Sequence, residues 1–305
     1  MEYVNLGNTD IKVSKVCLGC MGFGEPQAGM HSWTLPYEES QKIIKHALNQ
    51  GINFFDTAMG YQGGTSEEYL GRAIKEFSKR EDVVIATKFM PRSQVQIDQG
   101  VSAREHIETC LNNSLKRLQM DYVDLYILHR WDNVTPIKET MEILNDLVKS
   151  KKVRAIGVSN FSTGRLTDFA LQTPVIPAVN QIELHPYKQH KLIQKADKEF
   201  GTLTQAWAPF HRGEDGIFQD PTLTAIAEKH GKTVAQVILR WQTQQGILTI
   251  PKSTHIERMK ENFNSFDFHL DQADLDAISK LDRYPNAYGP DESVERIKHL
   301  LKYSV

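Results

Sequence analysis

The sequence predicts an α/β fold, a (β/α)8 TIM barrel preceded by a short β-hairpin and followed by a C-terminal helix. Eight short runs rich in β-branched and aromatic residues recur along the 305 residues, and amphipathic helical patterns separate them. Strands that alternate with helices pair in parallel, and eight such units form a closed barrel. The glycines after the first run read "GCMGFG" and not G-x-G-x-x-G, which weakens the alternative of a doubly wound open sheet. We expect one domain over residues 1–305.

The predicted elements follow one another in chain order. The opening "YVNLGNTDIKV" has two β-like runs around a turn, so a hairpin should cover the bottom of the barrel. The eight barrel strands are predicted at 15–20, 52–57, 82–88, 122–128, 153–159, 178–183, 203–208 and 246–251. Between them lie helical patterns such as "SAREHIETCLNNSLKRLQ", in which Ser102 is a predicted N-cap and Glu105 completes a capping box. The tail "DESVERIKHLLKYSV" is predicted to form the final helix.

Composition excludes several classes of partner. The chain has 36 basic and 38 acidic residues, so its net charge of −2 does not favour nucleic acid or an anionic membrane. We find no signal-peptide pattern and no run of about 18 apolar residues. We therefore expect a cytoplasmic protein, a monomer or weak oligomer, that acts on a small molecule and binds neither nucleic acid nor membrane.

Two of the three cysteines form the motif "CLGC". The motif invites a redox or metal-binding interpretation. Cys17 and Cys20 lie in a predicted strand, however, where positions three apart point to opposite faces. We expect small strand residues rather than a redox pair.

Ionisable side chains stand where three consecutive strands end. Asp56, Lys88 and His129 occupy those positions, and Tyr61 lies in the glycine-rich loop after Asp56. Catalytic residues of such barrels come from the C-terminal strand ends, and neighbouring strands are about 4.8 Å apart. Each residue alone could be a cap, a strand end, a core histidine or loop packing. Together they indicate a site, because a buried ammonium needs a carboxylate partner such as Asp56.

At these positions the sequence resembles the aldo-keto reductases. "FFDTAMGY", "ATKF", "LHRWD", "GVSNF", "NQIELHP" and "IPKSTHIERMKENF" match the family's landmarks in order, over residues 3–283. The first half resembles the bacterial and plant branch and the second half the aldose-reductase-like branch, so the subfamily is left open. The resemblance implies a barrel that uses NADPH without a Rossmann fold, and a catalytic tetrad of Asp56, Tyr61, Lys88 and His129.

The chemistry of carbonyl reduction suits these four side chains. A proton donor is needed at the oxygen, and a tyrosine with a pKa of about 10 is a reluctant acid. We expect Lys88 to lower the pKa of Tyr61 and Asp56 to hold Lys88 charged. His129 would donate a hydrogen bond to the substrate oxygen and align its carbon with the nicotinamide.

The later strands are expected to bind the cofactor. By resemblance, Ser159, Asn160 and Gln181 hydrogen-bond the nicotinamide carboxamide. Trp207 stands where the family stacks an aromatic ring, usually tyrosine, and Ala208 where serine is common.

The segment "PKSTHIERMKEN" follows the eighth strand, where many barrels bind phosphate. Lys252 and Arg258 supply two cations, with Ser253 and Thr254 as hydroxyl donors, and this pair suits the 2′-phosphate of NADPH. The resemblance adds contacts of Glu261 and Asn262 with the adenine.

Three other patterns fail on spacing. "GKT" at 231–233 lacks the glycine of a phosphate-binding loop, and "GVSNF" is not a nucleophile elbow. His185 and His190 are five residues apart with no third ligand evident nearby. We expect no metal.

The sequence does not identify the substrate. The long loop after the first strand is a candidate lid, and Met21, Met59, Phe89 and Trp131, together with Trp207, are expected to line an apolar cleft for an aldehyde or ketone. The predicted function is NADPH-dependent reduction of a carbonyl, with Tyr61 as proton donor. Two alternatives remain: a lyase or isomerase on a similar barrel, and a regulatory subunit that binds NADPH with little turnover.

Overall fold

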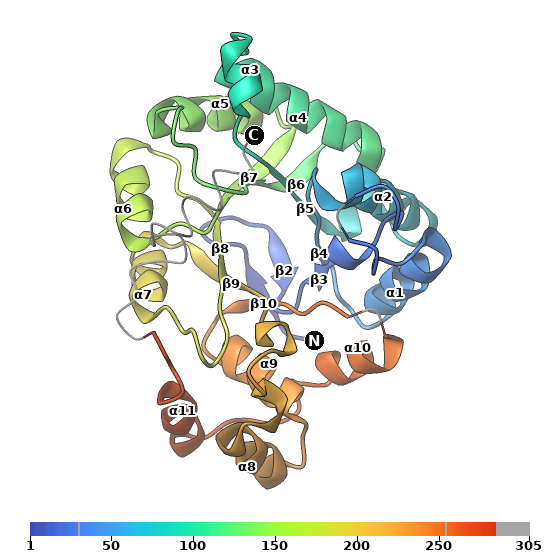
Figure 1. Cartoon of the computed structure of the whole chain (residues 1–305), viewed down its shortest axis with the longest axis vertical. Helices are drawn as coiled ribbons and strands as arrows, with labels where there is room; N and C mark the ends of the chain where they lie inside the picture. The colour runs from blue at the N-terminus through green and yellow to red at the C-terminus, as the bar shows by residue number, and fades with distance from the viewer. Residues whose placement is uncertain (30, 254, 285–305) are drawn as a thin grey trace.

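The computed structural model describes residues 1–29, 31–253 and 255–284, which form a barrel of eight parallel strands with helices around it (Figure 1). Neighbours in the chain are neighbours in the sheet, from β3 to β10. A parallel bridge between Val16 and Thr249 joins the two outer strands. The strands are β3 (Leu18–Gly19), β4 (Phe54–Asp56), β5 (Val84–Phe89), β6 (Val123–Leu128), β7 (Val153–Ser159), β8 (Val179–Glu183), β9 (Leu203–Trp207) and β10 (Leu248–Ile250). The predicted barrel is confirmed, with most strands a residue or more shorter than expected.

The predicted hairpin is also confirmed. β1 (Tyr3–Asn5) pairs antiparallel with β2 (Lys12–Ser14). Apolar side chains of the hairpin region join those of the barrel interior in one buried cluster, which includes Leu6, Ile11, Val13, Phe54, Leu125 and Ile250. Gly7 has a φ of +56°, and a Cβ there would lie 2.7 Å from the carbonyl oxygen of Ala178. The hairpin turn therefore rests directly on the barrel and closes its lower end.

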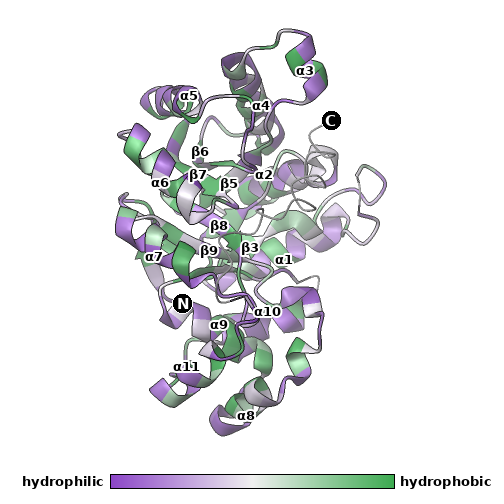
Figure 2. Ribbon diagram, turned by 60° about the vertical axis from the view of Figure 1, so that its left-hand side comes forward, coloured by the Kyte–Doolittle hydropathy of each residue, from purple (hydrophilic) through white to green (hydrophobic). Residues whose placement is uncertain are grey.

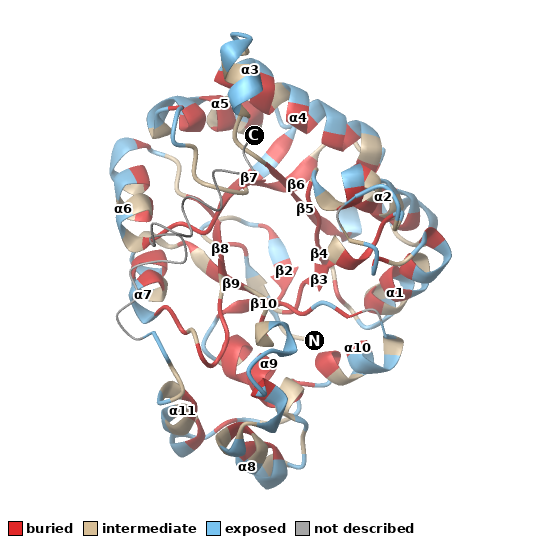
Figure 3. Ribbon diagram, viewed as in Figure 1, coloured by how far each residue is buried: buried red, intermediate tan, exposed pale blue. Residues whose placement is uncertain are grey.

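The helices form the outer layer of the barrel. They are α1 (Tyr37–Asn49), α2 (Thr65–Phe77), α4 (Ala103–Leu118), α5 (Ile137–Lys149), α6 (Thr163–Gln172), α7 (Lys191–Phe200), α9 (Val234–Gln244) and α10 (Ile256–Phe263), with α3 (Gln94–Asp98), α8 (Pro221–His230) and α11 (Gln272–Ser279) as additions. Their apolar residues face the strands and their polar residues face outward (Figure 2). Burial follows the same division, since the strands and the inner helix faces are buried (Figure 3). Among the described residues, no helix combines the length and the hydropathy that a membrane span requires.

The start of α4 corrects one local prediction. Ser102 is the N-cap, and its hydroxyl accepts a hydrogen bond from the backbone N–H of Glu105 at 3.1 Å. The Glu105 side chain is exposed and does not complete the capping box. The predicted N-cap is therefore confirmed, and the predicted capping box is wrong. An exposed Glu105 carboxylate can be hydrogen-bonded by solvent and does not need the backbone N–H of Ser102.

The two cysteines of "CLGC" belong to different buried clusters, but the prediction that both are strand residues is wrong. Cys17 precedes β3, and Cys20 begins a 3-10 turn (Cys20–Gly22). Cys17 belongs to the buried cluster that contains Phe54 and Leu125, whereas Cys20 belongs to the cluster that contains Phe55 and Tyr126. Both thiols are free and buried, and burial raises the pKa of each above its usual value. They are packing residues and do not form a disulfide. The predicted C-terminal helix at 291–305 and the predicted hydroxyl donor Thr254 lie outside the described residues.

Candidate active site

The four predicted catalytic residues meet at one end of the barrel. Lys88 at the end of β5 is fully buried, and its Nζ lies 2.5 Å from Oδ1 of Asp56, the last residue of β4. The same Nζ donates hydrogen bonds to the hydroxyl of Tyr61 at 3.1 Å and to the carbonyl oxygen of Thr57 at 2.8 Å. The ring of Tyr61 meets the ring of His129 edge to face, with 6.1 Å between centroids. Strand ends that are far apart in the sequence thus form one compact polar site.

The electrostatics of Lys88 follow from this geometry. Burial by itself would lower its pKa, but the negative charge of Asp56 and the hydrogen bonds that Lys88 donates to Asp56 and Tyr61 raise it above the usual value. The ammonium is therefore charged at every physiological pH.

The pKa of Tyr61 differs from the expectation. Burial raises it above 10, and the nearby Lys88 only partly offsets that increase. The prediction that Lys88 gives Tyr61 a lowered pKa is wrong in the net direction, because the desolvation of the phenol outweighs one neighbouring cation. Tyr61 therefore keeps its proton at neutral pH and remains a hydrogen-bond donor.

His129 follows β6 directly, and its backbone N–H donates to the carbonyl oxygen of Phe89. Burial lowers the pKa of its imidazole well below 6.5, and the charges of Lys88 and Arg130 lower it further. The ring is neutral at pH 7 and carries one N–H, as a donor to a carbonyl oxygen requires.

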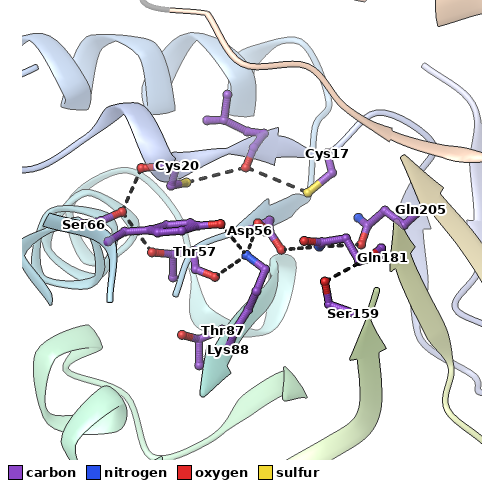
Figure 4. A network of polar contacts seen from close by, with 12 residues as sticks. Cys17, Cys20, Asp56, Thr57, Ser66, Thr87, Lys88, Ser159, Gln181 and Gln205 are labelled. Atoms are coloured by element: carbon purple, nitrogen blue, oxygen red, sulfur yellow. Dashed lines mark hydrogen bonds and ion pairs between the residues drawn. The ribbon is translucent and has the colours of Figure 1, made fainter. Parts of the chain in front are cut away.

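A second layer of amides supports the ion pair (Figure 4). Nε2 of Gln181 on β8 donates to Oδ2 of Asp56 at 2.9 Å, and also to Oε1 of Gln205 on β9 at 3.1 Å. Asp56 is thus held on one oxygen by Lys88 and on the other by Gln181. Neither Gln205 nor the Thr57 carbonyl was singled out from the sequence. Gln205 precedes Trp207 by two positions, so strand alternation alone would have placed it on the same face.

Ser159, Asn160 and Trp207 form a connected group beside this network. The Asn160 amide donates to Oγ of Ser159 at 2.9 Å, and the Trp207 indole N–H donates to Oδ1 of Asn160 at 3.1 Å. The hydroxyl of Ser159 donates to the carbonyl oxygen of Gln181 at 2.9 Å. Trp207 is partly exposed, so the residues predicted for the nicotinamide lie together around an aromatic ring.

A cleft of about 460 Å³ lies where the phosphate site is predicted, between α1 and α10. Arg258 lines it, with Lys42 and His255 as further basic groups and Glu39 and Glu257 as acidic ones. No described residue forms an ion pair with Arg258 or Lys42, whereas Glu257 is paired with Lys260 at 2.9 Å. A cleft with unpaired cations suits a phosphate group. Lys42 is on a helix far from "PKST" in the sequence, and no local pattern points to it.

Other predicted cofactor residues have partners within the chain. Nζ of Lys252 lies 3.8 Å from the ring centroid of Trp33, so the loop after β3 reaches this site. Oγ of Ser253 donates to the His255 carbonyl and accepts from its N–H. Glu261 accepts a hydrogen bond from the hydroxyl of Thr233, and Asn262 is buried.

The four residues predicted for the substrate pocket separate into two groups. Met21, Met59 and Trp131 are partly exposed in loops after β3, β4 and β6. Phe89 is 1% exposed and stacks on Tyr126 with 4.7 Å between ring centroids. The prediction for Phe89 is wrong, because alternation along β5 turns Lys88 inward and Phe89 outward against the helices.

The expectation that no third ligand lies near His185 is wrong. Glu183 and His211 lie beside His185, and donor atoms of the three residues are within 4.8 Å of one another. His190 is not part of this group. His211 follows β9, so its approach to β8 depends on the barrel and not on the local sequence.

Comparison with known proteins agrees with this site. The sequence model of the Aldo/keto reductase family matches residues 15–214 and 217–283. A glyoxal reductase of Bacillus subtilis is 40% identical over 246 residues, which are 80% of this chain and 84% of that protein. A methylglyoxal reductase of Escherichia coli O157:H7 is 37% identical over 270 residues, 87% of this chain and 92% of that protein.

Solved structures share the fold. The crystal structure of an aldo-keto reductase of the silkworm Bombyx mori in complex with NADP superposes with a TM-score of 0.78 at 29% identity. The match covers 92% of this chain and 93% of that one. By sequence and by fold, this chain belongs to the aldo-keto reductase family, whose members are oxidoreductases that act on carbonyl groups.

Proposed function

We propose that this chain uses NADPH to reduce the carbonyl group of small aldehydes or ketones to an alcohol, with Tyr61 as the proton donor. The observation that carries the proposal is the buried Lys88 ammonium, which contacts both the Asp56 carboxylate and the Tyr61 hydroxyl. Burying a lysine ammonium away from solvent costs free energy even when it is paired, so an ammonium that also contacts a tyrosine hydroxyl indicates a functional site.

The side chains divide the work of reduction. NADPH, when bound, supplies the hydride to the carbonyl carbon. Tyr61 donates its proton to the carbonyl oxygen, and the Lys88 ammonium stabilises the phenolate that remains. Neutral His129 donates a hydrogen bond to the same oxygen and orients the carbonyl. Asp56, fixed by Gln181, keeps Lys88 in position.

The cofactor would lie across the barrel mouth from Trp207 to the cleft between α1 and α10. Ser159, Asn160 and Gln181 carry amide and hydroxyl groups that match a carboxamide, and Trp207 offers a planar face to the nicotinamide. Arg258, Lys252 and Lys42 provide positive charge for the 2′-phosphate, with Ser253 beside them and Glu261 and Asn262 toward the adenine.

The substrate class follows from the rim and from the relatives. Met21, Met59 and Trp131 offer apolar surface around a small polar centre. Relatives named for glyoxal and methylglyoxal cover most of this chain, so small dicarbonyl aldehydes are the first substrates to test. We further propose a single-domain, cytoplasmic enzyme, monomeric or weakly oligomeric; its three cysteines are all free and buried.

The test is NADPH consumption with methylglyoxal, simple aldehydes and ketones, in wild type and in Tyr61→Phe. We expect Tyr61→Phe to lower kcat by at least about a hundredfold, since general acid catalysis contributes about 10²–10⁴. NADPH binding, followed by quenching of tryptophan fluorescence, should be unchanged because the ring remains. Equal kcat values in the two proteins would refute the role of Tyr61, and a wild type inactive on all substrates would refute the function.

A further inference from the structure

Glu183, His185 and His211 form a cluster of metal-ligating side chains that carbonyl reduction does not use. Glu183 ends β8, His185 follows two residues later, and His211 lies in the short 3-10 turn after β9 (His211–Gly213). One donor atom from each residue lies within 4.8 Å of the others. Shifts of about 1 Å would bring them to the separation of roughly 3.4 Å that bonds to one zinc ion require.

The two imidazoles have ring nitrogens without partners. His185 is 1% exposed, and both Nδ1 and Nε2 are buried with no hydrogen bond among the described residues. Nδ1 of His211 is likewise buried and unbonded. The two rings lie 4.2 Å apart, centroid to centroid. A buried polar atom without a partner is costly, and a shared cation would satisfy both rings at once.

The second ring nitrogen of His211 contacts a carboxylate, as is common for histidines that bind a metal ion. Its Nε2 lies 3.3 Å from Oδ2 of Asp215, and Asp215 is paired with Arg283 at 2.6 Å. A histidine that binds metal through one nitrogen commonly donates the N–H of the other to a carboxylate, which sets the tautomer. In that tautomer the lone pair of Nδ1, which has no hydrogen-bond partner among the described residues, is free to bind a metal ion.

Two neighbouring positive charges, on Lys188 and Arg212, would repel a metal cation bound at this cluster. Nζ of Lys188 lies 2.8 Å from Oε2 of Glu183, and Arg212 lies over the ring of Trp207. The Lys188 pair uses only one carboxylate oxygen, so Oε1 of Glu183 can accept a second cation.

We propose that Glu183, His185 and His211 bind one divalent transition-metal ion, for which Zn²⁺ is the best match. Two imidazoles and one carboxylate are a known zinc set that leaves a fourth position for solvent, and imidazole disfavours Mg²⁺ and Ca²⁺. The ion would join the loops after β8 and β9. This site is separate from the tetrad and does not depend on the proposed function.

The test is isothermal titration of the full, tag-free chain with ZnCl₂ after chelator treatment, with MgCl₂ as a second titrant. We expect one equivalent of Zn²⁺ to bind and Mg²⁺ not to bind. His211→Phe keeps the ring but loses the ligand, and Glu183→Gln keeps the shape but loses the charge. Each should weaken Zn²⁺ binding by about tenfold or more.

The matched control is His46→Phe, because His46 on α1 also packs on an aromatic ring, Phe263, but lies outside the cluster. It should bind Zn²⁺ as wild type does. Circular dichroism would verify that each variant is folded, and anomalous diffraction from a zinc-soaked crystal should place the ion among the three ligands. Equal affinity in wild type and both cluster variants, the absence of saturable binding, or a zinc peak elsewhere would each overturn the proposal.

Discussion

The buried ion pair of Lys88 and Asp56 is the residue-scale feature on which the site depends. Lys88 has no exposed surface and Asp56 is 3% exposed, so each needs the other's charge. Lys88 also donates a hydrogen bond to the hydroxyl of Tyr61, and Asp56 accepts one from the side chain of Gln181. Removing the charge of Lys88 should therefore lower both stability and activity. A second substitution at Asp56 separates the two effects.

We expect Lys88→Met to lower the free energy of unfolding by about 3–5 kcal/mol, because it leaves Asp56 buried and uncompensated. The double variant Lys88→Met with Asp56→Asn should recover most of that loss. Both should be inactive in NADPH oxidation, since neither has the ammonium. Urea unfolding at pH 7 measures the first effect. A double variant no more stable than the single one would show that the lost stability does not come from the Asp56 charge.

Residues at the strand ends were predictable from the sequence, but their ionisation was not. A polar residue that ends an apolar run is a local signal, and it identified Asp56, Lys88 and His129. The net direction of the Tyr61 pKa depends on how much protein surrounds the phenol, which no local pattern contains.

At the scale of elements, the cleft between α1 and α10 joins two parts of the chain more than 200 residues apart. Lys42 comes from α1 and Arg258 from α10. Sequence position after the last strand predicted Arg258, whereas Lys42 reached the cleft only because the first and last helices of a closed barrel are neighbours. We therefore propose that residues of these two helices discriminate between NADPH and NADH.

Arg258→Ala should raise the KM for NADPH by roughly 10-fold or more, since hydrogen bonds to charged groups contribute about 1.5–3 kcal/mol. The KM for NADH should change little, because NADH has no 2′-phosphate. Lys260→Ala is the control on the same helix, since Lys260 is paired with Glu257 and does not line the cleft. Steady-state kinetics with both cofactors decides this, and equal losses for NADPH and NADH would disprove the 2′-phosphate contact.

For the whole molecule, a buried carboxyl links pH to stability. Asp197 on α7 is fully buried and accepts hydrogen bonds from Asn180 on β8 at 3.0 Å and Thr204 on β9 at 2.6 Å. Burial raises its pKa from the ordinary 3.8 to about 7, although both hydrogen bonds act in the opposite direction. The folded protein therefore binds this proton more tightly than the unfolded chain does.

Because of Asp197, the free energy of unfolding should fall as pH rises from about 4 to 7. Asp197→Asn cannot ionise, so its stability relative to wild type should improve by on the order of 4 kcal/mol between pH 4 and pH 8. Urea unfolding across that range measures the difference. As a control, Asp276→Asn on the exposed face of α11 should show the same change in the free energy of unfolding with pH as wild type. If Asp197→Asn also showed the same pH dependence as wild type, Asp197 would not link pH to stability.

The sequence by itself determined the strand count, the hairpin, the helix that begins after Ser102 and the residues at the strand ends, because alternation, helical period and chain order are local properties. Tertiary structure decided the rest. Closure of the barrel brought Lys42 to Arg258, and the pairing of β8 with β9 brought His211 to Glu183 and His185. Burial also kept the Tyr61 phenol protonated. These outcomes depend on contacts between residues distant in the chain, and such contacts exist only once the barrel has formed.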